Sequence, residues 1–482
     1  MGRMDVSDSA SDVRREGLAR LEAAVRADLD VLAYPSREWI AERRTRAGAP
    51  VLDVLIVGGG QSGLGAAFGL MRERVTRLLV IDESAPDRCG PWNTFARMLT
   101  LRTPKYLTGA DFNLPNLTFR RWYEAQHGEE GWAALGFIPK ELWAEYLGWY
   151  RTVLQLPVRH RVKAGAIAWR ELDACFEVPL TEDGRTESVF ARKVVLAMGI
   201  DGSGRWHTPE HVAALPRARW AHTHEDIDFA ALRGKTVGVL GAGASAFDNA
   251  SVALEGGAAG VHLFFRRGSL PTINPYRWAE FAGFLRHHAD LPDAQRWRFI
   301  RKILEMGQLP PRDTFARARK HLAFHLHPGT TWREVEPRGD QVLVRTEEGE
   351  HLFDFLIIGA GFVTDLSARP ELANVFPHIA LWQDRFQPPA AEGHADLLRH
   401  PYLGRGFELQ EKAPGEAPWL GGLFNYTFGC LLSLGFGGAS ISGMKYSLPR
   451  LVGGVTAQLY ADDAEQHFRA LSDYGTQEFE VT

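Results

Sequence analysis

Cysteine is scarce in this chain of 482 residues, which contains three cysteines and no C-x-x-C pair. Cys89, Cys175 and Cys430 lie far apart in the sequence. This pattern argues against a disulfide framework and a redox-active dithiol, and it is typical of proteins from a reducing compartment. We therefore expect a cytoplasmic protein, and a disulfide reductase is disfavoured.

Long apolar runs and strong net charge are also lacking. The N-terminus has no apolar signal-peptide core, and acids are mixed with bases from Asp5 onward. The stretch from Leu420 to Met444 is uncharged, but it holds many glycines together with Asn425 and several serines, so we expect no membrane span. A formal net charge of −4 gives no reason to expect nucleic acid or an anionic membrane as a partner.

Metal-binding patterns are missing as well. The histidine-rich segment from His321 to His327 has the sequence HLAFHLH, with no acid or cysteine beside it. Its alternation is typical of a strand, so we predict no metal site. The aromatic and apolar residues at helical spacing from Leu142 to Leu154 are expected to face a core rather than a substrate.

The chain does contain glycine-rich turns. The first spans residues 58–63 and has the sequence GGGQSG. It follows Val54 to Val57, which is typical of a buried parallel strand, and it opens an Ala/Leu-rich helix. Glycine lets such a turn approach a pyrophosphate, whose charge then lies on free N–H groups at a helix N-terminus. The next strand ends in Asp82 and Glu83, where an acid can accept hydrogen bonds from ribose hydroxyls.

A second turn of the same kind spans residues 241–246 with the sequence GAGASA. Ala246 replaces the third glycine and is still small enough for close packing of helix on strand. The strand that follows ends in Arg266 and Arg267 instead of an acid. Guanidinium groups bind a 2′-phosphate that an acid would repel, so this site is predicted to prefer NADPH to NADH. Two such turns predict two dinucleotides.

The order of these segments predicts an α/β fold with two Rossmann-like dinucleotide-binding domains, the NADPH domain inserted into the other. A third strand, 193–199, ends the opening half of the first domain. A similar strand and turn, 354–362, suggests that the chain then returns to that domain. We therefore assign residues 51–205 and 340–482 to the first domain, 206–339 with a helical insert after residue 274 to the second, and 1–50 to an N-terminal helical extension.

The N-terminal extension has its own helix signal. Ser11 or Asp12 can cap a helix that Pro35 ends. Its apolar stripe should pack on the body of the protein or on a second subunit, and consists of Leu18, Leu21, Val25, Leu29 and Leu32.

These motifs resemble the two-dinucleotide-binding-domain flavoproteins, and among them the class B flavoprotein monooxygenases, over about residues 51–455. That class includes flavin-containing monooxygenases, Baeyer–Villiger monooxygenases and N-hydroxylases. In it the first turn binds FAD and the second binds NADPH. The resemblance therefore implies FAD contacts from Gly58, Gly60, Gln61, Ser62, Gly63, Asp82 and Glu83, and NADPH contacts from Gly241, Gly243, Ser245, Ala246, Arg266 and Arg267.

Other segments match the class in part. Residues 89–92 are similar to its Gly-Gly-x-Trp segment near the flavin, which implies a flavin contact for Trp92. The linker at 217–223 keeps half of the Phe-x-Gly-x-x-x-His fingerprint of Baeyer–Villiger and flavin-containing monooxygenases, including His222. Residues 354–362 are similar in spacing to an N-hydroxylase signature that other flavoproteins share. N- or S-oxygenation is slightly favoured because the Baeyer–Villiger linker is incomplete.

The resemblance implies that NADPH reduces FAD and that the reduced flavin adds O₂ at C4a to give a peroxyflavin oxidant in a dry pocket. Arg102 stands where flavin-containing monooxygenases have Asn, and it could hold a peroxide or a substrate carboxylate. His222 could reach NADPH; for both residues a structural role is an equal alternative. The turn with Gly437 and Gly438 precedes a helical segment ending at Pro449, whose N-terminus should stabilise the flavin's N1–C2 edge.

Two alternatives to a monooxygenase stay open at this point. An NADPH-dependent reductase or oxidase would release peroxide without a substrate, and a redox sensor would bind both cofactors without turnover. The expected partners are O₂ and a small-molecule substrate, which could be an amine, an amino acid, a sulfide or a ketone. Assembly into a homo-oligomer is a further alternative that the sequence leaves open.

Overall fold

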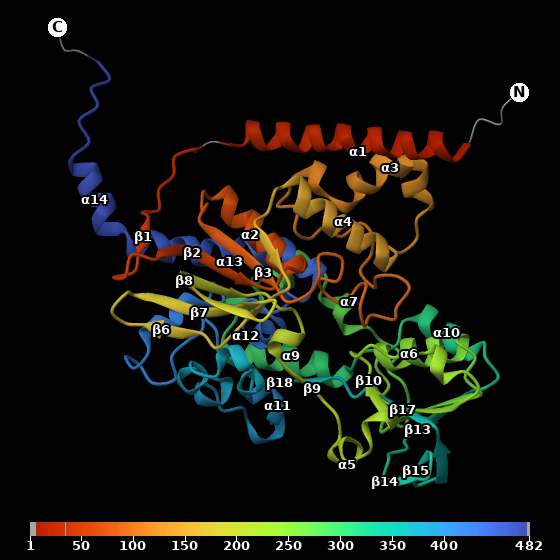
Figure 1. Cartoon of the computed structure of the whole chain (residues 1–482). Coiled ribbons are helices and arrows are strands. Elements are labelled where there is room, and N and C mark those ends of the chain that lie inside the picture. Colours follow the sequence, from red (N-terminus) through yellow and green to blue (C-terminus); the bar gives the residue numbers. More distant parts are fainter. Residues whose placement is uncertain (1–5, 34, 480–482) are drawn as a thin grey trace, which may run out of the picture.

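The computed structural model describes residues 6–33 and 35–479, and each of its two largest sheets contains a strand that leads through a glycine-rich turn into a helix (Figure 1). We call the part built on the larger sheet the first unit and the part built on the smaller sheet the second unit. Parallel strands form the centre of the larger sheet: β4 (Val158–His160), β3 (Leu78–Asp82), β2 (Pro50–Val57), β8 (Arg185–Leu196) and β19 (Leu423–Asn425). Antiparallel strands extend it: β1 (Arg43–Arg44), β5 (Val162–Ala164), β6 (Ala168–Arg170) and β7 (Cys175–Glu182).

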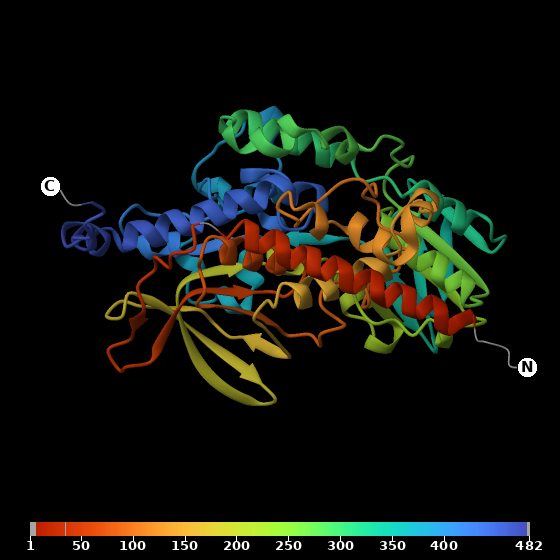
Figure 2. The same ribbon diagram turned by 90° about the horizontal axis from the view of Figure 1, so that it is seen from above.

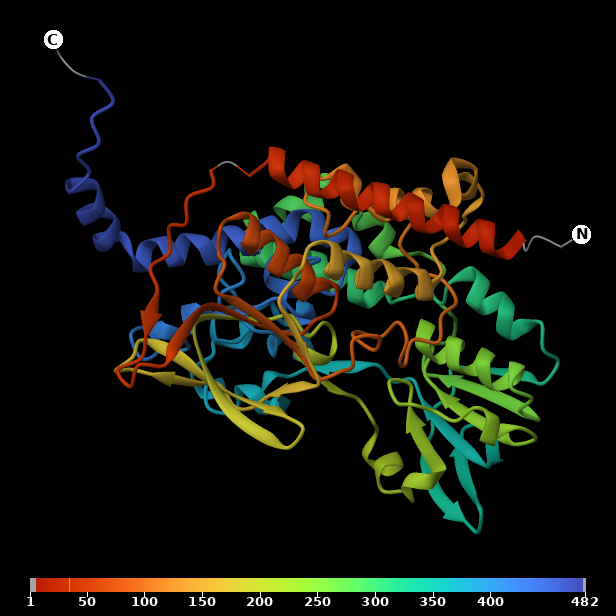
Figure 3. The ribbon, with the colours of Figure 1, turned by 45° about the horizontal axis from the view of Figure 1, so that its top comes forward.

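Helices cover the larger sheet and bury its apolar side chains in one continuous core. They are α2 (Gln61–Arg72), α3 (Phe119–Ala134), α4 (Lys140–Val153) and α13 (Ile441–Asp462), and α13 lies along α2. The N-terminal helix α1 (Val6–Val31) lies across α3 on the outside of the first unit (Figure 3). Leu21 and Val25 are buried there, which confirms the predicted stripe, whereas Leu32 lies beyond the helix and is exposed.

The second unit has a five-stranded parallel sheet in the order β10 (Trp220–His222), β17 (Phe355–Ile358), β11 (Thr236–Leu240), β12 (Gly260–Phe265) and β13 (Phe324–Pro328). One face packs against α6 (Ala244–Glu255) and α10 (Arg312–Arg319). The other face packs against a small antiparallel sheet of β14 (Glu334–Arg338), β15 (Gln341–Thr346) and β16 (Gly349–Phe353). The α/β fold class with two Rossmann-like units agrees with the sequence-based expectation.

Strand β17 corrects one sequence-based expectation. We expected residues 354–362 to lead the chain back to the first unit, but β17 lies in the second sheet between β10 and β11. The chain returns only with β18 (Phe362–Thr364), which pairs with β9 (Gly204–Trp206) on the outgoing connection. The boundary predicted at 340 therefore falls inside the second unit, in the turn between β14 and β15.

The likeness between the turns after 193–199 and 354–362 has a structural basis, because both follow the strand beside a fingerprint strand. In the first unit the N–H of Ala197 donates to Val57, and in the second the N–H of Gly359 donates to Leu240, each at 2.7 Å. The two segments occupy equivalent positions in two copies of the same motif.

The helical insert belongs to the second unit in the sequence but lies against helices of the first unit. It contains α7 (Pro275–Ala279), α8 (Ala282–His287) and α9 (Asp293–Met306), and it packs on α12 (Leu431–Leu434) and α13 of the first unit (Figure 2). Among its aromatic residues Phe284 and Trp297 are buried, while Trp278 and Phe281 are about half exposed. The remaining short helices are α5 (Glu210–Ala213), α11 (Ala395–Leu398) and α14 (Ala464–Ser472).

Helix α13 is longer than predicted. We expected it to end at Pro449, but it continues through this proline to Asp462. A proline inside a helix removes one backbone hydrogen bond, and the buried side chains of Leu451, Val455 and Leu459 keep the later turns on the core. The uncharged stretch before it forms β19, α12 and the first turn of α13, and no helix in the described ranges is long and apolar enough to cross a bilayer.

Candidate cofactor and active site

Three of the four glycines in the first turn have different structural requirements. Gly58 has a φ of +110°, and a Cβ placed on it would lie 2.7 Å from the carbonyl oxygen of Ala197. A Cβ on Gly63 would lie 1.8 Å from the oxygen of Gly58. Gly60 has an ordinary φ of −75°, and a Cβ there meets no protein atom within 4 Å. The fold itself therefore requires Gly58 and Gly63, whereas Gly60 borders open space.

The open space at Gly60 fits a bound pyrophosphate. Gly60 is the N-cap residue of α2, and no side chain accepts a hydrogen bond from the first turn of this helix. Free N–H groups at a helix N-terminus attract an anion, and the missing side chain lets it approach the backbone. These features suit the diphosphate of FAD.

The second turn repeats this arrangement. Gly241 has a φ of +126°, and a Cβ on it would lie 2.2 Å from the oxygen of Gly359. Gly243 has a φ of −72°, caps α6, and borders open space as Gly60 does. Ala246 packs against Gly359, where any added Cβ would come within 2.7 Å of the alanine Cβ. Ser245 is exposed on the first turn of α6, so this helix N-terminus also suits a dinucleotide diphosphate.

Asp82 is fixed at the end of β3 beside the first turn. One carboxylate oxygen accepts from the N–H of Gly59 at 2.7 Å, and the other accepts from the N–H of Ser84 at 2.8 Å. Each oxygen has further acceptor capacity, so Asp82 can still bind ribose hydroxyls. Glu83 is exposed and makes no ion pair or side-chain hydrogen bond within the described ranges.

The structure brings the two glycine-rich segments of the first unit together. The Ser62 hydroxyl donates to the carbonyl oxygen of Gly438, a residue 376 positions away in the sequence. A Cβ on Gly438 would lie 2.0 Å from the oxygen of Tyr426, and one on Gly437 would lie 2.5 Å from the sulfur of Cys430, so this turn needs glycine. The N-termini of α2 and α13 thus meet at one place, as the expected flavin site requires.

Trp92 and Gln61 are linked through Trp143, which the sequence analysis expected only to pack in a core. The Trp143 indole N–H donates to Oε1 of Gln61 at 3.2 Å. Its ring lies edge to face against Trp92 at 6.5 Å between centroids. Lys140 donates to the Trp92 carbonyl at 2.7 Å. Trp92 is therefore buried close to the first turn, and Trp143 is a site residue that helical periodicity alone did not distinguish from its neighbours.

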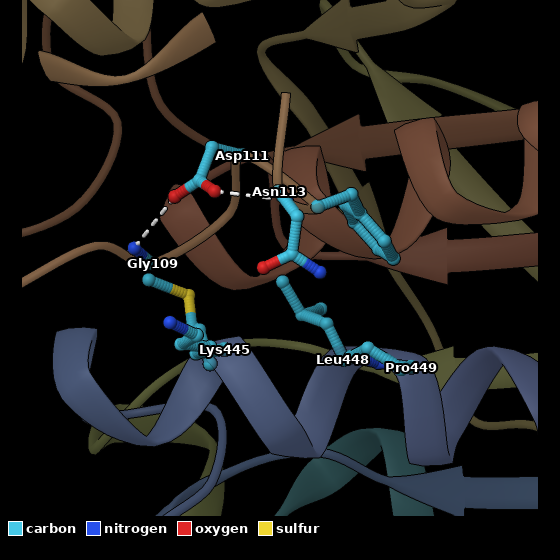
Figure 4. A pocket seen from close by; sticks show the side chains of 8 residues that line it. Gly109, Asp111, Asn113, Lys445, Leu448 and Pro449 are labelled. Atoms are coloured by element: carbon cyan, nitrogen blue, oxygen red, sulfur yellow. Dashed lines mark hydrogen bonds between the residues drawn. The ribbon is translucent and has the colours of Figure 1, made fainter. Parts of the chain in front are cut away.

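A shallow hollow beside α13 is too narrow for a substrate (Figure 4). Asp111 accepts from the N–H groups of Gly109 at 3.1 Å and Asn113 at 2.9 Å. Burial raises the pKa of its carboxyl, and Lys445 on α13 lowers it only in part. This carboxylate closes the loop on which it stands.

Arg102 forms an ion pair with a residue of the second unit. Its Nη2 lies 3.1 Å from Oδ2 of Asp248, a buried residue on α6 of the second unit. Asp248 Oδ1 also accepts from the Thr314 hydroxyl at 3.0 Å. Asp248 was not predicted as a site residue, although an acid within the apolar first half of α6 is a signal that it needs a buried partner.

His222 is almost completely buried at the end of β10. Its Nδ1 lies 2.8 Å from Nδ1 of His224, and its ring lies 5.3 Å from that of Trp206. Burial, with the neighbouring His224, lowers the pKa of His222 to about 4. The imidazole is therefore neutral near pH 7, so a contact of His222 with NADPH would be made by an uncharged ring.

The two arginines after β12 differ in their contacts. Arg267 donates to the carbonyls of Glu305 at 3.0 Å and Met306 at 3.1 Å, and so it caps the end of α9. Arg266 is exposed and forms no ion pair or hydrogen bond in the part of the chain that the structure describes. Arg266 is the better candidate for a 2′-phosphate.

Replacing Arg266 by alanine should weaken NADPH binding about 10- to 100-fold, because charge-assisted hydrogen bonds contribute about 1.5–3 kcal/mol. NADH lacks the 2′-phosphate, so its affinity should stay within about twofold. The measurement is the concentration dependence of anaerobic flavin reduction with each nucleotide. Arg267→Ala is the matched control, and it should lower thermal stability without changing the preference for NADPH over NADH. Equal losses for both nucleotides in Arg266→Ala would contradict the assignment.

The histidine-rich segment lies mainly in β13, which confirms the predicted strand. His325 stacks on His262, and His327 lies 3.0 Å from Nδ1 of His262. Within residues 6–33 and 35–479, no group of three or more His, Cys, Asp or Glu side chains is arranged to hold a metal ion.

Comparisons with known proteins agree with this geometry. A family model described as FAD-NAD(P)-binding matches residues 55–201. A second model, L-lysine 6-monooxygenase/L-ornithine 5-monooxygenase, matches residues 133–280. Among curated proteins, the FAD-dependent urate hydroxylase of Xanthomonas campestris pv. campestris is 48% identical over 96% of this chain and 97% of its own length.

Solved structures show the same fold at low sequence identity. The ornithine hydroxylase of Pseudomonas aeruginosa superposes with a TM-score of 0.66 and 15% identity, covering 85% of this chain and 100% of that one. The ornithine N-hydroxylase of Kutzneria sp. 744, solved with reduced FAD, NADP⁺ and L-ornithine, also has a TM-score of 0.66, with 14% identity over 85% of this chain and 100% of that one. At this identity the likeness concerns the fold alone.

The fold, the two nucleotide turns and these relatives define a class B flavoprotein monooxygenase. More particularly, the chain belongs to the same family as the FAD-dependent urate hydroxylase of Xanthomonas campestris. The predicted binding of FAD and of a nicotinamide dinucleotide and the predicted monooxygenase activity are confirmed, and neither the peroxide-forming reductase nor the redox sensor is supported.

Proposed function

We propose that this monooxygenase hydroxylates urate, using one O₂ and one NADPH in each turnover. The observation that carries the proposal is the 48% identity to a urate hydroxylase along nearly the whole of both chains. The acceptor would then be an atom of the electron-rich purine ring, rather than the amine or sulfide toward which the sequence analysis leaned.

The site residues support this proposal by holding the two cofactors. The N-terminus of α2 would bind the diphosphate of FAD, with Asp82 at its ribose. The N-terminus of α6 would bind the diphosphate of NADPH, with Arg266 at the 2′-phosphate. When bound, the flavin accepts a hydride from NADPH and then activates O₂. The chain's own task is to orient both dinucleotides and to exclude water.

The N-terminus of α13 supplies the electrostatic part of this task. Ser440 caps the helix by accepting from the N–H of Gly443, and Ser62 ties the preceding turn to α2. A helix N-terminus carries a partial positive charge, which would favour a reduced, anionic flavin ring placed beside it. The helical insert that packs on α12 and α13 would close this place from solvent.

The test measures NADPH, O₂ and urate together with purified holoprotein. We expect urate, followed by its ultraviolet absorbance, to disappear in about a 1:1 ratio to NADPH, with little hydrogen peroxide released. L-ornithine and L-lysine serve as competing substrates because a lysine and ornithine monooxygenase model matches residues 133–280. Hydroxylation of either amino acid without urate loss would overturn the proposal, as would oxidation of NADPH to peroxide alone.

A further inference from the structure

One buried carboxylate of the second unit takes its counter-charge from the first. Asp248 is 2% exposed and lies on α6, five residues after the turn glycine Gly243. Its only ion-pair partner within the described ranges is Arg102, with the Thr314 hydroxyl as a second, neutral donor. The contact therefore joins the two units at the helix that opens the second nucleotide turn.

Arg102 stands on a rigid part of the first unit. The preceding residue, Leu101, is 3% exposed, and its N–H donates to the carbonyl of Ile138 at 2.7 Å. Thr100 forms a bridge with Pro139 at the start of α4. The backbone that leads into Arg102 is therefore anchored to the first unit.

The surrounding seam between the units has a hollow that is open to solvent. The hollow has a volume of about 320 Å³ and lies beside Thr314, between Leu99 of the first unit and helices α6 and α10. Arg97 of the first unit donates to the carbonyl of Glu225 in the second unit at 3.2 Å. It also forms an ion pair with Asp226 at 3.9 Å, and the Asp226 side chain is 89% exposed. Exposed pairs contribute little, so the stronger charged link here is the Arg102–Asp248 pair, in which the Asp248 side chain is buried and the Arg102 side chain is 35% exposed.

Separation of the units would leave Asp248 buried without an ion-pair partner, with Arg317 of its own unit as the other cation that acts on it. An ionised carboxylate that lacks an ion-pair partner is costly to keep out of water. Burial raises the pKa of Asp248, and the Arg102 guanidinium and Thr314 hydroxyl oppose that rise. The pair therefore favours a single placement of α6 relative to the first unit.

We propose that Arg102 and Asp248 are positioning residues for hydride transfer: they hold α6, and with it the nicotinamide cofactor, at a fixed place relative to the flavin. This inference rests on the assignment of α2 to FAD and α6 to NADPH. In the step that the pair serves, a hydride leaves C4 of the nicotinamide and binds N5 of the flavin, so NADPH is oxidised as FAD is reduced. A misplacement of about 1 Å can slow such a step about 100-fold.

The experiment is anaerobic, single-turnover reduction of the flavin by saturating NADPH, without urate. Arg102→Gln and Asp248→Asn should each reduce the rate about 10-fold or more, while FAD content and reduction by dithionite stay unchanged. Arg102→Lys keeps the charge and should recover part of the rate. The double variant should lose no more than the worse single variant, because both substitutions remove the same contact.

Asp340→Asn provides the matched control. Asp340 is fully exposed and pairs with Arg219 of the same unit at 2.6 Å, so its loss should leave the reduction rate unchanged. Wild-type rates in Arg102→Gln and Asp248→Asn, or fully additive losses in the double variant, would overturn the proposal. So would a lower melting temperature with a normal rate, which would indicate a structural role only. The reduction rate is measured without urate. A finding that urate is not the substrate would therefore not change the conclusion about Arg102 and Asp248.

Discussion

Gly60→Val should give a folded protein that carries almost no FAD. A Cβ at this position meets no protein atom within 4 Å, and the φ of −75° suits any residue, so the fold does not oppose the side chain. The branched side chain would instead occupy the space that a diphosphate needs at the N-terminus of α2. The measurement is flavin absorbance per protein after purification, with an expected occupancy below about one tenth; relative to a wild type about nine tenths occupied, this corresponds to a loss of about 2.6 kcal/mol of binding free energy or more.

Gly63→Ala is the informative comparison for this variant. Its Cβ would lie 1.8 Å from the oxygen of Gly58, so the turn itself must shift and the protein should lose thermal stability as well as FAD. Gly136→Val is the neutral control, since Gly136 is exposed, far along the chain from both turns, and equally open around its Cβ position. A yellow Gly60→Val protein with full flavin content would show that FAD does not use this turn.

Local patterns allowed both nucleotide turns to be predicted from the sequence. Gly58 and Gly241 need positive φ, and Gly63 and Ala246 need little volume, because each contacts backbone a few residues or one strand away. These requirements for positive φ and small volume appear in the sequence as short motifs with fixed spacing. The same holds for the strands beside them and for the helical insert, whose periodicity was visible along the chain.

Contacts between segments that are distant in the sequence could not be predicted from these local patterns. Nothing near Ser62 indicates that its hydroxyl bonds to Gly438, and nothing near Arg102 indicates Asp248 as its partner. Strand β17 was placed in the wrong sheet for a related reason: its apolar run fits either parallel sheet, and only pairing with β11 decides between them. Side-chain roles at the site depend on these long-range pairings.

Gly243→Val should keep FAD and lose reduction by NADPH. Gly243 borders open space at the N-terminus of α6, and its φ of −72° places no demand for glycine on the fold. A valine side chain would keep the NADPH diphosphate away from the N–H groups of this helix. We expect flavin reduction at a fixed, subsaturating NADPH concentration to slow more than about 100-fold, which corresponds to about 2.7 kcal/mol.

Dithionite separates the possible causes of that loss. It reduces the flavin without a nucleotide site, so Gly243→Val should be bleached by dithionite at the wild-type rate while NADPH leaves it yellow. Gly60→Val and Gly243→Val then form a crossed pair: the first loses the flavin, and the second keeps it but loses its reductant. The two turns have similar geometry but are followed by different residues, Asp82 and Arg266, which indicate separate roles. Loss of FAD in Gly243→Val, or normal reduction of this variant by NADPH, would contradict these separate roles.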